Sequence, residues 1–236
     1  MEALFGLIIF LFFIALFAVP LLLMAHNNDK YDVPQEVVWH EDYLTFGNRT
    51  LKYADAEYLA FTLRHDTAKT NGVWTTYDAY AYAVNLSGIV VARSHEAYKG
   101  YNKPEGLINE YQDIVAKATQ HILPVIFRKA VKTLENNGKL TIDEVTFHSN
   151  GTVSFKNKTY KATDLETSYY QGNAVLRNKA VKTVFGNPKE ICKASLANGN
   201  VCLYEPLLRY LQASQTFGLS GSYAQAQRNR VNDFTL

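Results

Sequence analysis

The chain opens with an unbroken apolar run. Residues 3–25 contain no charged side chain, and about 20 helical residues suffice to cross the ~30 Å hydrocarbon core of a bilayer. The apolar core of a cleaved signal peptide is shorter, about 7–15 residues, and follows a basic segment, whereas only Met1 and Glu2 precede this run. The pattern therefore predicts one retained N-terminal transmembrane helix and a single-pass membrane protein.

Residues 26–36 are polar and include Pro34, which is typical of a short tether. The positive-inside rule compares basic residues on the two sides of a span. Here it relies on Lys30 and Arg49 alone, so it favours a cytoplasmic body weakly and leaves the side undetermined.

Beyond the tether, apolar and polar residues alternate as in strands, with aromatic and β-branched side chains enriched. Asn71-Gly72 is a hairpin signal. The strands predicted before and after a central helical segment are 37–41, 43–46, 51–65, 73–85 and 89–93, then 139–148, 152–155, 159–162, 166–170, 174–177, 181–185 and 191–196.

Two stretches have helical periodicity instead. Apolar residues recur at helical spacing over 107–134, and Pro124 inside this stretch is expected to kink the helix or split it in two. A second helix is expected over 203–213, where Pro206 fits only in the first turn. The Gly-, Ser- and Gln-rich residues 214–236 are expected to form a flexible tail.

The body contains an internal repeat. Residues 44–57 align without gaps to residues 153–166, with six identical positions among fourteen. In each copy a strand ends in Phe, a short turn follows and a second strand begins. The predicted fold class is therefore α+β: a transmembrane helix (1–25), a tether (26–36), a strand-rich repeat with a long helix (37–137), a second strands-plus-helix repeat (138–213) and a tail (214–236). Convergent hairpin chemistry is the alternative explanation of the match.

The hairpin followed by YADAEYL (53–59), together with the closing helix sequence VCLYEPLLRYL (201–211), resembles bacterial pleckstrin-homology-like (PH-like) domains. The resemblance implies a PH-like barrel or a pseudo-duplicated domain. Each copy is expected to have fewer than the seven strands of that family, and the helix of the first copy is unusually long.

The resemblance also implies a binding site at the repeated hairpins, because basic residues near the first hairpin of PH domains receive lipid phosphates. The residues in those positions are Arg49, Lys52, Lys156, Lys158 and Lys161. Anionic headgroups attract such residues; the alternative is that they are simply solvated turn residues.

The net charge bears on the class of partner, and the cysteine content bears on possible disulfides. The formal net charge is only +2, whereas nucleic-acid-binding proteins usually have a concentrated basic face. No nucleic-acid partner is therefore expected. The two cysteines, Cys192 and Cys202, flank a turn at residues 197–200 and leave open a hairpin disulfide or two unpaired thiols.

No recognised catalytic or metal-binding motif is present, so no cofactor is expected. His40 and His148 occupy equivalent repeat positions and are interpreted as packing residues. The pairs Asp55/Glu57 and Asp164/Glu166 share a face if they lie on strands, which suits a structural role better than acid–base catalysis.

The sequence favours a membrane-tethered, non-enzymatic interaction or scaffold module, acting alone or as a subunit of a membrane complex. It is expected to contact the bilayer through its N-terminal helix and to bind a membrane protein. The alternative is a membrane-anchored hydrolase with an unfamiliar site between the repeats.

Overall fold

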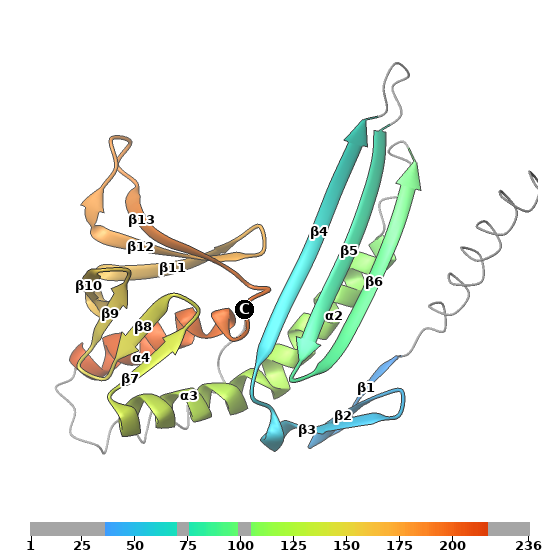
Figure 1. The fold of residues 1–236 in the computed structure, drawn as a ribbon, viewed down its shortest axis with the longest axis horizontal. Coiled ribbons are helices and arrows are strands. Elements are labelled where there is room, and N and C mark those ends of the chain that lie inside the picture. The colour runs from blue at the N-terminus through green and yellow to red at the C-terminus, as the bar shows by residue number, and fades with distance from the viewer. Residues whose placement is uncertain (1–35, 70–75, 99–104, 217–236) are drawn as a thin grey trace, which may run out of the picture. The chain divides into compact units, whose positions relative to one another are not determined.

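A computed structural model describes residues 36–69, 76–98 and 105–216 of the chain (Figure 1). The described residues from Val37 onward belong to one compact unit. They contain thirteen strands, joined in antiparallel meanders, and three α-helices.

The first half consists of two three-stranded sheets joined by a 3-10 turn. In the first sheet the strands follow the order β1-β2-β3, and in the second β4-β5-β6. The elements are β1 (Val37–Trp39), β2 (Tyr43–Phe46), β3 (Arg49–Lys52), η1 (Tyr53–Asp55), β4 (Leu59–Lys69), β5 (Thr76–Leu86) and β6 (Ile89–Tyr98).

The second half has a four-stranded sheet, β10-β9-β8-β7, a 3-10 turn and a three-stranded sheet, β11-β12-β13. Its elements are β7 (Lys139–Ile142), β8 (Val145–His148), β9 (Thr152–Phe155), β10 (Lys158–Lys161), η2 (Ala162–Asp164), β11 (Leu165–Tyr170), β12 (Asn173–Lys182), β13 (Pro188–Ser195), η3 (Val201–Leu203) and α4 (Tyr204–Thr216).

The two copies of the repeated sequence have the same local structure. Leu44 pairs with Leu51 in the first hairpin, and Val153 pairs with Tyr160 at the equivalent position of the second. The amide of Tyr53 donates to Asp42 O over 2.9 Å, and the amide of Ala162 donates to Gly151 O over the same distance. The repeat therefore corresponds to one structural unit, a hairpin whose second strand runs into a 3-10 turn.

The helical segment in the middle of the chain forms two helices, α2 (Glu105–His121) and α3 (Leu123–Asn137). Pro124 lies in the first turn of α3, where a missing backbone N–H costs no helical hydrogen bond. The predicted split is thus confirmed. Gly138 ends α3 in the left-handed conformation (φ 71°), which glycine adopts without the steric penalty of a Cβ atom.

Apolar side chains from strands and helices form a shared core. From α3 the core takes Ile126, Phe127 and Leu134; from α4 it takes Leu207 and Leu211. Glutamines of α4 fix the helix to the strands: Gln212 donates 2.9 Å hydrogen bonds to the carbonyls of Ala162 and Leu165, and Gln215 donates to Gly151 O over 2.9 Å.

Backbone pairing joins the start of β4 to the loop after β13. The Phe61 amide donates to Leu196 O (2.8 Å), and the Asn200 amide donates to Leu59 O (2.9 Å). The Asn200 side chain completes this pairing, since its Oδ1 accepts from the Leu59 amide and its Nδ2 donates to Glu57 O, both over 3.1 Å. Residues 141 positions apart in sequence are therefore held together by one asparagine.

The structure corrects the predicted fold class and the membrane localisation. Within the described ranges, no helix is both long and apolar enough to span a membrane. The helices α2, α3 and α4 have 17, 15 and 13 residues, and their outer faces carry charged residues such as Lys132 and Arg209. By this finding, the prediction of a single-pass membrane protein with a transmembrane helix is wrong. The segment on which the prediction relied, residues 3–25, lies outside the described residues, and so does the tether up to residue 35.

Several predicted boundaries also change. The predicted strand 51–65 is interrupted by η1, because Tyr53 and Ala56 turn inward into the core. The final helix continues to Thr216, so residues 214–216 are helical rather than part of a flexible tail; residues 217–236 are outside the described part.

Asn200 provides a direct test of the pairing between the halves. It has φ 67°, a conformation that costs other non-glycine residues about 1 kcal/mol. We expect Asn200→Ala to lower the free energy of unfolding by about 2–4 kcal/mol, because two hydrogen bonds of about 1 kcal/mol each are lost as well. Asn200→Gly, which adopts this backbone freely, should cost about 1 kcal/mol less. Urea denaturation measures both, and an alanine variant within about 0.5 kcal/mol of wild type would contradict the importance of this pairing.

Candidate functional site

The basic residues singled out at the repeated hairpins fall into two sets. Arg49 and Lys52 lie on β3, at one edge of the β1-β2-β3 sheet, while Lys158 and Lys161 lie on β10, at one edge of the four-stranded sheet. Within each strand the two residues are three positions apart and therefore point to opposite faces.

Two of these basic side chains have intramolecular partners. The Arg49 guanidinium donates to Gly88 O over 3.2 Å, which ties β3 to the turn between β5 and β6. The Lys156 ammonium lies 5.0 Å from the centre of the Phe155 ring, a cation–π distance. The hairpins therefore present exposed positive charge at the edges of two separate sheets, and their role as an anion site stays a prediction.

Hydroxyl side chains form a row across the outer face of the four-stranded sheet. The row consists of Thr141, Thr146, Ser154 and Thr159, which are paired in register across the four strands. Oxygen–oxygen distances of 2.9 Å join Thr141 to Thr146 and Ser154 to Thr159. The row stabilises the register of short strands through cross-strand hydrogen bonds.

His148 extends this row, with its Nε2 2.9 Å from Ser154 Oγ. His40, its counterpart in the first copy, stacks instead on Tyr43 with the ring centres 4.3 Å apart. Each histidine is thus explained by a different structural contact.

The carboxylate pairs do not share a strand face as expected. Asp55 and Asp164 end the two 3-10 turns, whereas Glu57 follows η1 and Glu166 lies in β11. A break in strand geometry inside each pair removes the two-residue alternation on which the shared face depended.

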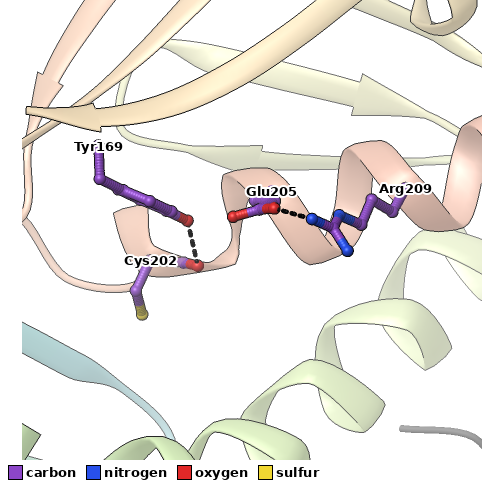
Figure 2. A network of polar contacts seen from close by, with 4 residues as sticks. All are labelled: Tyr169, Cys202, Glu205 and Arg209. Carbon is purple, nitrogen blue, oxygen red and sulfur yellow. Dashed lines mark hydrogen bonds and ion pairs between the residues drawn. The ribbon is translucent and has the colours of Figure 1, made fainter. Parts of the chain in front are cut away.

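Buried phenol and thiol groups lie where β11 meets η3 and α4. Figure 2 shows Tyr169 pointing at the backbone of Cys202, to whose carbonyl its hydroxyl donates over 3.0 Å, and Glu205 paired with Arg209 one turn further along α4. Burial raises the pKa of Tyr169 and that of Tyr204 well above 10.0. These phenols remain protonated at neutral pH and act as structural donors.

Both cysteines are free and buried, which settles the open choice in favour of unpaired thiols. Cys192 lies on β13 and Cys202 in η3. Burial raises the pKa of the Cys192 thiol to about 11 and that of Cys202 to about 12. Neither thiol is a nucleophile at neutral pH, since the thiolate is the reactive form.

The feature that sequence reasoning missed is the hairpin between β12 and β13. Residues 179–187 are all exposed, and in Figure 1 the two strands end in a loop that projects from the sheet. Val184 is 99% exposed and Phe185 is 90% exposed. The pattern Val-Lys-Thr-Val-Phe predicted a strand over 181–185, but β12 ends at Lys182.

A tight turn fixes these two side chains at the tip. The Gly186 amide donates to Thr183 O (2.9 Å) and the Thr183 amide donates to Asn187 O (2.8 Å), so Val184 and Phe185 are the two central residues of a β-turn. Gly186 follows with φ 80°. The signal in the sequence was this Gly186-Asn187 pair, which marks a turn rather than a continuing strand.

The described residues contain no group of three or more His, Cys, Asp or Glu side chains suited to hold a metal ion. Comparisons with known proteins add no relative: no family model, curated protein or solved structure matches the chain.

The buried thiols predict how stability changes with pH. An unfolded thiol loses its proton near pH 9.0, whereas folded Cys202 keeps its proton up to pH about 12. The unfolded state therefore binds fewer protons in this window, and the free energy of unfolding falls as the pH rises. We expect Cys202→Ala to reduce this fall by about 1 kcal/mol between pH 9 and 10, as measured by urea denaturation at each pH. Parallel curves for wild type and variant across that window would contradict burial of this thiol.

Proposed function

We propose that this protein is a non-enzymatic interaction module that engages its partner through the β12–β13 hairpin. The observation that carries this proposal is the near-complete exposure of Val184 and Phe185. Large apolar side chains at the tip of a projecting element are typical anchors of binding surfaces, because their burial on binding supplies the favourable free energy.

The composition of the turn supports a binding role over a structural one. The central positions of β-turns are usually taken by Gly, Asn, Asp, Pro or Ser, for which the turn conformation is intrinsically favourable. Here they hold a β-branched residue and an aromatic ring with no core to fill. Departures from local preference with no gain in packing are expected at functional sites.

The scaffold behind the hairpin is suited to hold it in place. Along β12, Ala174, Val175 and Leu176 are buried at 0–2% exposure, and the strand is paired on both sides, with β11 and with β13. This regular pairing runs to Asn178, and the exposed tip extends from it beyond a register shift between Asn178 and Lys182.

We also propose that the resemblance to PH-like domains concerns the second half of the chain. Residues 139–216 form a four-stranded sheet, a three-stranded sheet and a C-terminal helix. Their seven strands are the number expected for that family. The first half has two three-stranded sheets before its helices, six strands in all and one fewer than the family has. The hydrolase alternative, with a site between the repeats, stays a prediction.

Site-specific photocrosslinking tests the proposed function in cells that produce the protein. We expect p-benzoylphenylalanine in place of Phe185 to give a discrete adduct, because this side chain enters the partner. The matched control is the same photoprobe in place of Tyr170, an exposed ring (61%) at the neighbouring β11–β12 hairpin. For an adduct to a protein, excess wild-type chain should compete, whereas a chain carrying Val184→Ser and Phe185→Ser should not.

Two results would contradict the proposal. One is the absence of any adduct specific to position 185, whether to protein or to lipid. The other is an identical adduct pattern from positions 170 and 185, which would show unspecific contact with whatever surrounds the protein.

A further inference from the structure

The hairpin that carries the apolar tip is strongly basic. Residues 178–189 include Lys179, Lys182 and Lys189 and contain no Asp or Glu. All three lysines are exposed. This concentration of one sign contrasts with the chain as a whole, whose formal net charge is only +2.

The lysines flank the tip from both strands. Lys179 and Lys182 come from β12 and Lys189 from β13. The register shifts between Asn178 and Lys182, and such a bulge bends the strand and interrupts its strict alternation of faces. Lys182 pairs with Pro188 beside the tip, and Lys189 pairs with Asn178 further down the hairpin, so both strands that lead to the apolar tip carry exposed positive charge.

We propose that this hairpin docks on an anionic lipid surface, with Val184 and Phe185 inserted among the acyl chains and the three lysines at the level of the headgroup phosphates. The inference rests on the proposed function, whose partner it specifies. It concerns a reversible contact made by a hairpin of the folded unit, not a membrane-spanning segment, and it does not involve the basic residues of the repeated hairpins.

The small size of the apolar surface favours lipid over a protein pocket. A stable protein interface buries about 800 Å² on each partner, whereas the apolar part of this hairpin consists of Val184, Phe185 and the partly exposed Val181 (43%). Neighbouring tip residues, Thr183 and Asn187, are polar. An exposed apolar tip with lysines on both strands of its hairpin meets the two requirements for interfacial binding, namely apolar area that can be buried and attraction to anionic headgroups.

Fluorescence of a label at the tip tests this inference on the full chain. Val184→Cys is labelled with an environment-sensitive maleimide dye and mixed with phosphatidylcholine vesicles with or without phosphatidylserine. The native thiols do not compete for the dye, since Cys192 and Cys202 are both buried. The matched control carries the dye at Tyr170→Cys; because the rest of the chain is identical, vesicle contacts made elsewhere affect both proteins equally.

We expect a blue shift at position 184 with phosphatidylserine vesicles, and none at position 170 or with phosphatidylcholine alone. Replacing Lys179, Lys182 or Lys189 by Gln should weaken binding about fivefold for each lysine removed, and added salt should weaken it in the same direction.

Two outcomes overturn the inference. A shift of equal size on neutral vesicles removes the role of the lysines. No shift at position 184, together with a competed protein adduct in the photocrosslinking experiment, assigns the hairpin to an acidic protein partner and leaves the proposed function standing. If no adduct specific to position 185, to protein or to lipid, forms in cells, the proposed function itself fails.

Discussion

Residues 57–61 are the segment on which the described structure depends, because hydrogen bonds hold it from two sides. On one side, Ser87 Oγ accepts from the amides of Glu57 and Tyr58, over 2.9 and 3.0 Å, and donates to Tyr58 O over 2.8 Å. On the other side, Asn200 pairs with the backbone of Glu57 and Leu59. Leu59 itself is fully buried, so an unmade bond at its amide or carbonyl would leave a polar group without water to replace the lost partner. This double pairing makes the start of β4 common to both halves of the chain.

The sheet that carries the exposed β12–β13 hairpin is anchored to the rest of the fold by side-chain hydrogen bonds. The β11-β12-β13 sheet is held by Tyr169, which bonds to the Cys202 carbonyl, and by Gln212, which bonds to the start of β11. Cys202 belongs to the same η3 segment that Asn200 precedes, so the sheet, α4 and β4 share one network. The hydrogen bonds within the turn, between Gly186 and Thr183 and between Thr183 and Asn187, limit the conformational freedom that the apolar tip loses on binding, which is the benefit of preorganisation.

Sequence patterns predicted local structure well where a proline or a turn motif marks the end of a helix or strand. Pro124 marked the division between α2 and α3, and the repeated Phe-x-Asn-x-Thr turn marked both 3-10-linked hairpins. The predicted secondary structure was wrong where tertiary contacts, rather than the local sequence, determine the backbone conformation. Tyr53 looks like a strand residue, yet its burial against the core turns the chain into η1. Val184 and Phe185 also looked like strand residues, and only their hydrogen-bonded turn shows them to be exposed. The pairing by Asn200 spans 141 positions and leaves no local pattern. The membrane interpretation, based on apolar length alone, did not survive the finding that no described helix can cross a bilayer.

Native-state hydrogen exchange measures the shared pairing at the start of β4 most directly. The amides of Leu59 and Phe61 donate to groups of the second half, Asn200 Oδ1 and Leu196 O, and exchange only when that pairing opens. If the two halves form one cooperative unit, these amides have the same protection factors as the buried β12 amides of Val175 and Leu176, and all of them share one opening free energy. Exchange of Leu59 and Phe61 that is faster by orders of magnitude, with β12 still protected, would show that the halves open independently and would contradict the account.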